Sequence, residues 1–174
     1  NLEDISAPRC FEIEERLKEL LDIPVFHDDQ HGTAIVVLAG IINALKVTGK
    51  QKENCKVVVN GAGSAGIAST KLLLTYGFTD VTMCDKEGII GKDYPNLNWM
   101  QQNMTKVTNR ADAHGTLADA LKGADIFVGV SDPNIVTPQM VSSMNKDAIL
   151  FAMANPVPEI MPDLAKAAGA RVVG

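Results

Sequence analysis

The feature that most constrains this chain is a glycine-rich turn between a short apolar run and a helical pattern. Residues 56–60 read Lys-Val-Val-Val-Asn, and residues 61–66, Gly-Ala-Gly-Ser-Ala-Gly, match G-x-G-x-x-G. An apolar run without polar alternation is typical of a strand buried on both faces of a parallel sheet. Residues 65–76 then have helical periodicity and end at Gly77. Strand, turn and helix in this order predict a dinucleotide-binding unit.

Each position in this turn has a physical role. Gly61 permits the tight turn, Gly63 lets the backbone approach a pyrophosphate, and Gly66 lets helix and strand pack closely. Ser64 and Ala65 lie at the predicted helix N-terminus, whose free N–H groups and partial positive charge favour phosphates. A tight turn that binds nothing is the alternative, and the surrounding pattern makes it the weaker one.

The acidic residue expected after the next strand is Asp85, which follows a predicted strand at residues 81–84. Its carboxylate can accept hydrogen bonds from the ribose hydroxyls of NAD and would repel the 2′-phosphate of NADP, although Lys86 could partly offset that repulsion. We therefore expect NAD as the cofactor, with NADP as the alternative. Ser131 follows a predicted strand at 125–130 and falls at the crevice where cofactors bind in open sheets, although a plain turn role fits equally well.

The remaining pattern continues the alternation of strands and helices. Further strands are expected at 148–153 and 171–173, and helices at 97–103, 117–121, 138–144 and 163–168. Residues 86–115 are rich in Gly, Pro and Asn and predict loops without a clear strand. The alternation predicts an α/β fold: a Rossmann-like doubly wound, mostly parallel sheet with helices on both faces.

The first fifty residues precede this unit and have their own pattern. The expected elements are a helix from Pro8 to the Ile23-Pro24 pair, a short strand at 23–27, a helix at 32–47 and a polar linker at 49–55. The helix at 32–47 is apolar nearly all round, as in the interior of a large protein. We therefore divide the chain into residues 1–50, an N-terminal segment, and 51–174, the dinucleotide-binding domain. Together they are expected to form one compact unit, cut at both ends from a longer protein.

Composition excludes several classes of partner. The net charge of −5 is spread without a block of Lys or Arg, so nucleic acid is not an expected partner. No apolar run reaches about 18 residues, so no membrane partner is expected. The three cysteines, Cys10, Cys55 and Cys84, are odd in number and form no C-x-x-C pair, which argues against disulfides and a thiolate metal site. A reducing cytoplasm is the expected compartment.

Two acidic pairs, Glu3-Asp4 and Asp28-Asp29, are separated by one predicted helix and one short strand. Such an excursion can bring both pairs to one place. Paired carboxylates repel each other, and a hard cation such as Mg²⁺ or Mn²⁺ is the usual way to keep them ionised in a cleft. Helix capping by Asp28 and Asp29 is an equally good interpretation of the residues alone.

His27 and His31 suggest a second hypothesis, a zinc site, because two histidines at i and i+4 beside carboxylates could bind zinc. The H-E-x-x-H motif is absent, and the predicted strand end and helix start need not place the two rings on one face. Packing or hydrogen bonding is therefore the favoured role for both.

Residues 25–34, Val-Phe-His-Asp-Asp-Gln-His-Gly-Thr-Ala, preceded by the acidic pair and followed by the glycine turn and Ala154-Asn155-Pro156, resemble the bacterial form of malic enzyme. The resemblance covers the whole chain in order. It implies that Glu3, Asp4 and Asp29 bind Mn²⁺ or Mg²⁺.

The same resemblance implies two catalytic residues. Asp28 would orient a catalytic lysine, and Asn155 would hydrogen-bond near the nicotinamide and the substrate carboxylate. Without the resemblance, an Asn before a Pro at a strand end would be read as a turn. The family's tyrosine acid and lysine base precede the Glu3-Asp4 pair, and a further substrate-binding Asn follows residue 174, so this segment alone is expected to be inactive.

The implied reaction is oxidative decarboxylation of (S)-malate to pyruvate and carbon dioxide with NAD or NADP, in a full-length enzyme expected to be a homo-oligomer, a dimer. Hydride leaves C2 for the nicotinamide, and a divalent cation would stabilise the enolate formed on decarboxylation. Malolactic enzyme, which converts malate to lactate, shares these motifs. A nucleotide-binding module without chemistry of its own is the alternative outside enzymes.

Overall fold

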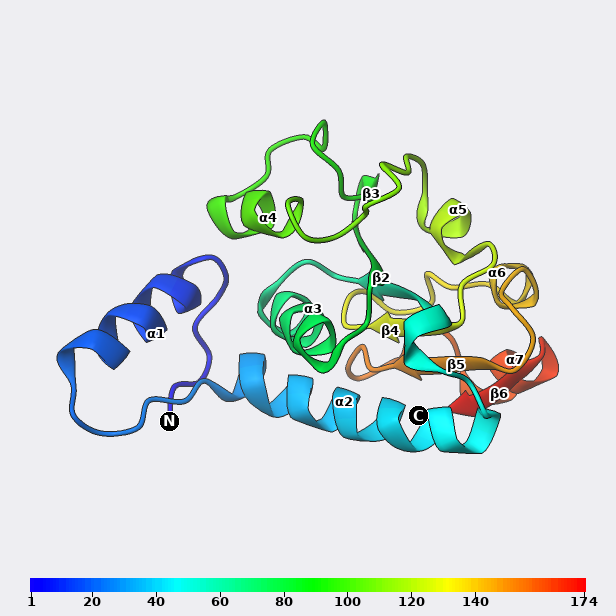
Figure 1. Cartoon of the computed structure of the whole chain (residues 1–174), viewed down its shortest axis with the longest axis horizontal. Coiled ribbons are helices and arrows are strands. Elements are labelled where there is room, and N and C mark those ends of the chain that lie inside the picture. The colour runs from blue at the N-terminus through cyan, green and yellow to red at the C-terminus, as the bar shows by residue number, and fades with distance from the viewer.

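The computed structural model of the protein describes all residues from Asn1 to Gly174. Helices and strands alternate along most of the chain (Figure 1). In chain order the elements are α1 (Arg9–Leu20), α2 (Asp28–Thr48), the 3₁₀ turn η1 (Lys52–Asn54), β1 (Lys56–Asn60), α3 (Ser64–Tyr76), β2 (Asp80–Asp85), β3 (Gly88–Ile89), α4 (Trp99–Met104), α5 (Leu117–Leu121), β4 (Ile126–Gly129), α6 (Pro138–Ser142), β5 (Ala148–Ala152), α7 (Pro162–Ala167) and β6 (Ala170–Val173).

The six strands form one sheet in the order β3-β2-β1-β4-β5-β6. All neighbours are parallel except β2 and β3, where Cys84 lies opposite Ile89 in an antiparallel pair. In the central register, Val58 of β1 lies opposite Thr82 on one side and Phe127 on the other. Strand order reverses between β1 and β4, so the crevice beyond their carboxyl ends is where an open α/β sheet binds its ligand. The predicted doubly wound fold is confirmed.

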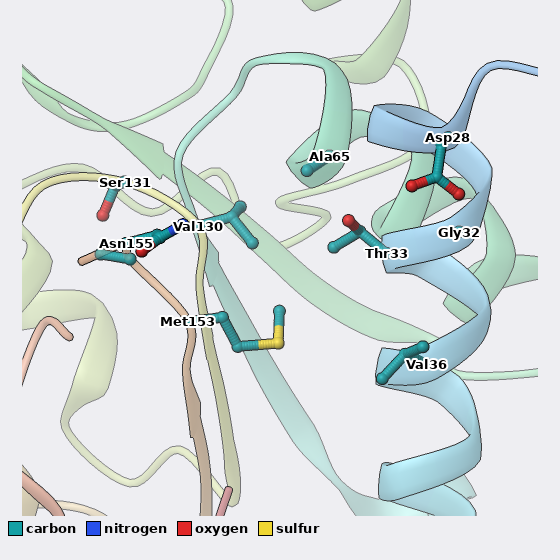
Figure 2. A pocket seen from close by; sticks show the side chains of 10 residues that line it. Asp28, Gly32, Thr33, Val36, Ala65, Val130, Ser131, Met153 and Asn155 are labelled. Carbon is teal, nitrogen blue, oxygen red and sulfur yellow. The ribbon is translucent and has the colours of Figure 1, made fainter. Parts of the chain in front are cut away.

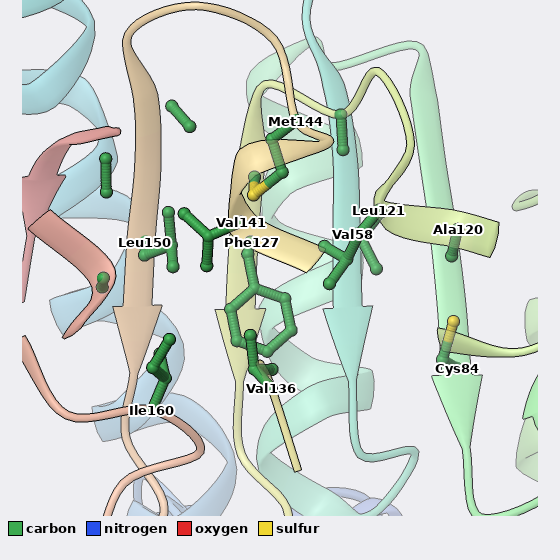
Figure 3. Close-up of a cluster of buried hydrophobic side chains, with 14 of the residues drawn as sticks. Val58, Cys84, Ala120, Leu121, Phe127, Val136, Val141, Met144, Leu150 and Ile160 are labelled. Carbon is green, nitrogen blue, oxygen red and sulfur yellow. The ribbon is translucent and has the colours of Figure 1, made fainter. Parts of the chain in front are cut away.

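Alternate residues of the central strands β1, β4 and β5 enter two separate apolar cores. Val57 and Val59 of β1 face α2 and α3, together with Ile41 and Leu73 from those helices. On the opposite face, Val58 joins a core with residues of β4, β5, α5, α6 and α7 (Figure 3). Both faces are therefore covered by helices, which explains why β1 carries no polar alternation.

A third apolar cluster attaches α1 to the domain. Cys10 and Phe11 of α1 pack with Ile67 of α3 and with Met100 and Met104 of α4. In Figure 1, α3 lies between α1 and the strands, and α4 lies above α3, to the left of β3. This cluster closes over the start of α3 and so borders the glycine turn.

The structure corrects several sequence-based expectations in the N-terminal half. The helix expected at 32–47 begins four residues earlier, at Asp28, with His27 as its N-cap. No strand forms at 23–27; instead Leu2 and His27 make an isolated parallel bridge, in which Leu2 N donates to Phe26 O at 2.6 Å. Residues 86–115 do contain a strand, the two-residue β3. Pairing cannot continue beyond His27, because α2 begins at the next residue, Asp28.

Helix α2 is less buried than its composition indicated. Val37, Ile41 and Ala44 are buried on the sheet, but Ile35 and Val36 are 56% and 66% exposed. By length and composition alone, α2 is also the one helix that could cross a membrane. Because one side of α2 forms part of the domain core, its hydrophobicity is accounted for by packing on the sheet, and its outer apolar side remains uncovered in this chain.

Candidate functional site

The glycine turn connects β1 to α3 at the carboxyl end of the sheet, and two of its glycines are required by the backbone. Gly61 has φ 105°, and a Cβ there would overlap the Val130 carbonyl. At Gly66, in the first turn of α3, a Cβ would overlap the Gly61 carbonyl oxygen. Only glycine therefore allows the helix to approach the turn this closely. Sequence reasoning had assigned these roles to both positions.

Gly63 differs from both, because nothing in the chain requires it to be glycine. Its φ of −89° and ψ of −159° suit any residue, and a Cβ built there meets no atom within 4 Å. It is the N-cap of α3, so the free N–H groups of Ser64 and Ala65 follow it directly. The turn thus leaves open space in front of a helix N-terminus, as a pyrophosphate site needs.

Asp85 ends β2 next to this turn and is held by hydrogen bonds. Its Oδ1 accepts from Lys86 N at 3.0 Å, and its Oδ2 accepts from Gln101 Nε2 at 3.4 Å. Gln101 also donates to the Ala62 carbonyl at 3.2 Å, so this amide links the acidic residue to the glycine turn. Gly61, Gly63, Asp85 and Ser131 line one groove, which has the groups expected to bind a ribose and its phosphate.

A second cavity of ≈ 520 Å³ adjoins this groove and lies between α2 and the loops after β4 and β5 (Figure 2). Asp28 and Thr33 line it from α2, Ala65 from the start of α3, and Ser131 and Asn155 from the two loops. The structure therefore brings together Asp28, Ser131 and Asn155, which are far apart in the sequence. Its size suits a small ligand, and Asp28 is the one side chain in its lining that titrates.

The carboxylate of Asp28 lies beside Gly32, one turn further along α2. A Cβ at Gly32 would overlap the Asp28 carboxylate, so the glycine provides the room that this carboxylate occupies. His27 provides no side-chain cap, and Asp28 and Asp29 occupy the first turn rather than the position before the helix. Carboxylates in the first turn are favoured by the helix dipole, so this part of the capping interpretation remains physically sound.

Ser131 is joined to the loop after β5 by Glu159, which lies four residues beyond Asn155 in that loop and is 0% exposed. Glu159 Oε1 accepts from Ser131 N at 2.9 Å and from Ser131 Oγ at 3.0 Å, and its Oε2 accepts from Ala154 N at 3.0 Å. Asn60, at the end of β1, donates to Ser131 Oγ at 2.7 Å. The ends of β1, β4 and β5 are thus tied together at the cavity.

The two predicted metal-binding pairs lie on neighbouring segments. The Leu2–His27 bridge places Glu3 and Asp4 beside the start of α2, where Asp28 and Asp29 lie. Their carboxylate oxygens are the donors that a hard divalent cation prefers. The structure does not, however, gather three or more acidic, histidine or cysteine side chains into a cluster suited to a metal ion. The assignment of Glu3, Asp4 and Asp29 therefore stays a prediction.

His27 and His31 belong to a hydrogen-bond network between α1 and α2. Gln30 Nε2 lies 2.9 Å from His27 Nδ1 and donates to Glu14 Oε2 at 3.3 Å, while His31 Nε2 lies 2.5 Å from Glu14 Oε1. Burial would raise the pKa of the Glu14 carboxyl, but hydrogen bonds from Lys18 and His31 outweigh burial and lower it. The geometry matches the hydrogen-bonding role that the sequence favoured over zinc.

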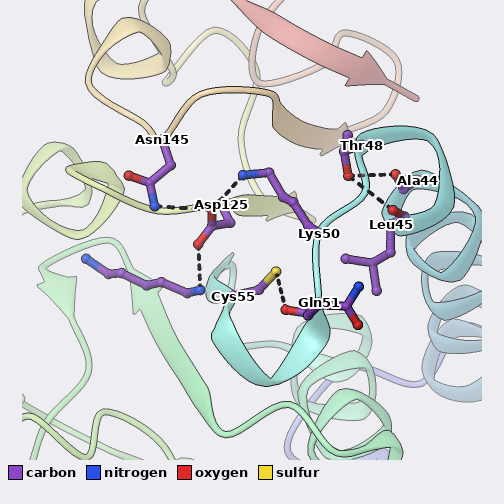
Figure 4. Close-up of polar contacts among 9 residues, drawn as sticks. Ala44, Leu45, Thr48, Lys50, Gln51, Cys55, Asp125 and Asn145 are labelled. Atoms are coloured by element: carbon purple, nitrogen blue, oxygen red, sulfur yellow. Dashed lines mark hydrogen bonds and ion pairs between the residues drawn. The ribbon is translucent and has the colours of Figure 1, made fainter.

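At the opposite end of the sheet, Asp125 anchors a network before β4 (Figure 4). It accepts from Lys50 Nζ at 2.7 Å, from Lys56 N at 2.9 Å and from Asn145 Nδ2 at 3.1 Å. Burial alone would raise the pKa of this carboxyl, but the hydrogen bonds from Lys50 and the other donors hold it below its ordinary value. This network joins the linker after α2 to the strand and faces no site residue.

The three cysteines are free and buried. Burial raises the pKa of Cys55 to about 11 and that of Cys84 to about 12, so these thiols stay protonated at neutral pH. Cys84 precedes Asp85 but points into the core rather than the groove. Thiolate chemistry at this site is therefore excluded.

Sequence reasoning missed three polar residues that shape the site: Asn60, Gln101 and Glu159. Asn60 could have been noticed, because a polar residue ends an otherwise apolar strand directly before the glycine turn. Gln101 and Glu159 carry no such signal. Gln101 lies in a loop-rich region, and the burial of Glu159 depends on two loops that only the fold brings together.

Comparison with known families gives one match over most of the chain. Residues 30–167 match the family described as "Malic enzyme, NAD binding domain". The matched region includes the glycine turn, Asp85, Ser131 and Asn155, whereas the predicted metal ligands Glu3, Asp4 and Asp29 precede it.

Individual relatives agree with this match. The chain is 57% identical over its full length to a bifunctional malic/malolactic enzyme from Bacillus subtilis, of which it covers 43%, and 48% identical over 94% of its length to an NADP-dependent malic enzyme from Rhizobium meliloti, of which it covers 21%. The crystal structure of an NAD-dependent malic enzyme from Thermotoga maritima superposes with a TM-score of 0.97 at 49% identity, over 100% of this chain and 47% of that one. The chain thus spans less than half the length of these relatives.

Proposed function

Because the chain belongs to the malic enzyme family, whose NAD binding domain it matches, we propose that it supplies the cofactor-binding half of an enzyme that oxidatively decarboxylates (S)-malate to pyruvate and carbon dioxide. One observation carries the proposal. The groove at Gly63 and Asp85 continues past Ser131 into the cavity lined by Asp28 and Asn155. A dinucleotide held at the glycine turn would therefore present its far end to a pocket that is lined by both polar and apolar residues.

Each group of the chain has a defined task in this reaction. The α3 N-terminus after Gly63 binds the pyrophosphate, and Asp85 accepts hydrogen bonds from the ribose. Ser131 and Asn155 line the region of the nicotinamide, where the Asn155 amide can donate to a substrate carboxylate. When bound, the nicotinamide accepts the hydride from C2 of malate. The residues of the chain hold the two reactants in register, which is the main contribution of a cofactor domain.

Acid–base chemistry needs groups beyond those in the cavity. Asp28 is the one titratable side chain in its lining, and no lysine or tyrosine contributes there. We infer that the catalytic base and acid come from the part of the enzyme outside residues 1–174, and that Asp28 orients the base. This inference fits relatives that are more than twice as long as the chain.

For the cofactor we favour NAD over NADP. Asp85 presents a carboxylate where the 2′-phosphate of NADP would lie, and Gln101 fixes its orientation. The relatives use either cofactor, so the family alone does not decide between them. The exposed neighbour Lys86 is the group that would favour NADP.

We also propose that Glu3, Asp4 and Asp29 bind Mg²⁺ or Mn²⁺, supported by their donor chemistry and by the bridge that joins their segments. The three carboxylates would hold the ion, which would supply a Lewis acid for the decarboxylation step.

The full-length enzyme tests this proposal. We expect malate, Mn²⁺ and NAD to yield pyruvate and NADH in equal amounts. Lactate formation without accumulation of NADH would select malolactic activity instead, which one relative combines with malic enzyme activity. Cofactor binding without turnover of malate would reduce the chain to a nucleotide-binding module.

A further inference from the structure

The loops that form one wall of the cavity share a single buried acceptor. Val130 and Ser131 follow β4, and Ala154 and Asn155 follow β5. Glu159 lies further along the loop after β5, and its carboxylate accepts from Ala154 N of its own loop and from Ser131 N and Oγ of the loop after β4. The carboxylate is therefore the side-chain link between Ser131 and the backbone next to Asn155, in addition to backbone bonds such as that from Met153 N to Gly129 O at 2.9 Å.

This carboxylate has no cationic partner. Its three partners are two backbone N–H groups and one hydroxyl, and it takes part in no ion pair. Burying a carboxylate without a counter-ion is costly unless several donors satisfy it. Gly129 leaves the room, because a Cβ at Gly129 would overlap the Glu159 carboxylate. Backbone bonds from Asn134 N to Pro158 O and from Val136 N to Glu159 O, each 3.0 Å, also hold the segment against the chain that follows Ser131.

The side chains at the strand ends form a chain of hydrogen bonds in which each donor lies closer to β1 than its acceptor. Asn60 Nδ2 donates to Ser131 Oγ, and the same hydroxyl donates its proton to Glu159 Oε1. Because the serine hydroxyl accepts one hydrogen bond and donates another, its orientation is fixed by Asn60 and Glu159. Ser131 is thus presented to the cavity in one geometry, and the Ala154 tether restrains the adjacent Asn155.

We propose that Glu159 is a positioning residue for malate turnover: by accepting hydrogen bonds from both loops, it places Asn155 and Ser131 at the separation that substrate and nicotinamide require. The proposal rests on the malic enzyme activity proposed above. Glu159 does not line the cavity, so it acts only through the loops.

Substituting glutamine for Glu159 keeps the size of the side chain but removes its charge and one of its two hydrogen-bond acceptors. The two oxygens of Glu159 each accept a backbone N–H, so a carboxamide must turn its NH₂ group towards one of them. Oε1 accepts two donors and Oε2 accepts one, so the NH₂ group should face Ala154 and release the loop of Asn155. In the full-length enzyme, E159Q should lower kcat/KM for malate by about tenfold or more while Kd for NAD changes by less than about threefold.

Asp125 provides the matched control, because it is also a buried carboxylate that joins three segments, but at the other end of the sheet. D125N should lower thermal stability at least as much as E159Q does, with kcat/KM for malate within about threefold of wild type. E159D keeps the charge but is shorter by one methylene, so its carboxylate can still accept from one of the two loops. Its kcat/KM for malate should therefore lie between those of wild type and E159Q.

The outcomes are separable. If wild-type enzyme oxidises malate but E159Q keeps wild-type kcat/KM, or loses no more than D125N, the positioning role is wrong. If wild-type enzyme itself shows no malate turnover, the proposed function fails first. Should E159Q not fold, hydrogen–deuterium exchange on the wild type still decides: segments containing the Ser131 and Ala154 amides should be protected, and rapid exchange of both would overturn the proposal.

Discussion

The two ends of the sheet each contain a buried carboxylate, and the groups around them differ. Before β4, Asp125 is paired with Lys50 and two further donors in a closed network with no adjoining site residue (Figure 4). Near the other end of the same strand, Glu159 has only neutral donors, from Ser131 and Ala154. The loops that carry these residues border the cavity (Figure 2). An ion pair secures the fold at one end, whereas at the other the polar groups hold loops in place around open space.

This contrast extends to the glycines. At the carboxyl end, Gly61 and Gly66 are required by backbone contacts, while Gly63 faces open space. A position that is glycine without a local structural reason points to a ligand as the reason. A structural group in this chain is therefore one whose identity is required by contacts within the chain, whereas a functional group has no such contact that requires it. The following substitutions test that distinction, in order of expected effect.

The largest effect is expected for Gly66→Ala. Its Cβ would overlap the Gly61 carbonyl, so α3 must move away from the turn, at a cost of about 3–5 kcal/mol of unfolding free energy. Denaturant unfolding measures this. The same substitution at Gly63 is the matched control and should cost less than about 1 kcal/mol. Equal losses at both positions would contradict the assigned contacts.

Gly63→Val should separate cofactor binding from stability. The branched side chain has room in the chain but fills the space in front of the α3 N-terminus. We expect Kd for NAD, measured by calorimetry on the full-length enzyme, to rise by about 100-fold, which is roughly 2.7 kcal/mol. The thermal midpoint should stay close to wild type. Unchanged affinity would remove the cofactor assignment of the turn.

Asp125→Asn should show the reverse pattern, with lower stability and unchanged NAD affinity. Removing the charge leaves Lys50 without its partner, and we expect a loss of about 2 kcal/mol at pH 7. Because the folded pKa of Asp125 lies below its ordinary value, this stabilisation is present above the unfolded pKa of about 4 and is lost as pH falls through the folded pKa. The difference from wild type should therefore narrow below about pH 4 in unfolding experiments. A difference that widens there would contradict the lowered pKa.

Asp29→Asn in the full-length enzyme should raise the Mn²⁺ concentration required for half-maximal activity by roughly ten- to thirtyfold, because a ligand charge is removed. Kd for NAD should hardly change, since Asp29 does not line the groove at the glycine turn. Asp22→Asn removes an exposed charge from the same segment and serves as the control. Metal-independent activity of Asp29→Asn would rule out the ligand assignment.

The smallest effect concerns cofactor preference. Asp85→Ser removes the charge that opposes the 2′-phosphate, and we expect the ratio of kcat/KM for NADP to that for NAD to rise roughly five- to tenfold. Asp80→Ser, at the other end of β2, is the matched control and should leave the ratio unchanged. A wild-type enzyme that already prefers NADP strongly would instead assign the preference to Lys86.

Much of the fold could be predicted because it depends on local pattern. The bounds of β1 and α5 were predicted to the residue, and the other helices and strands of the dinucleotide-binding domain lie within a few residues of their predicted ranges. The exceptions are informative. The two-residue β3 is too short to carry periodicity. Residues 23–27 were predicted to form a strand, but only His27 pairs, and α2 begins directly after it. The start of α2 was predicted four residues late, at Gly32, because its first turn is polar and gives no apolar signal.

The sequence by itself determined the glycine turn, the acidic residue that follows β2 and the buried parallel strands, because each depends on residue types at fixed spacing along a few neighbouring positions. Tertiary structure alone decided which distant groups meet: Gln101 with Asp85, Asp28 with Asn155, and Glu159 with the loops after β4 and β5. These contacts join elements across the sheet, and their partners are not set by spacing. Whether an isolated glutamate in an apolar stretch is a solvated surface group or a buried tether depends on what the fold places around it.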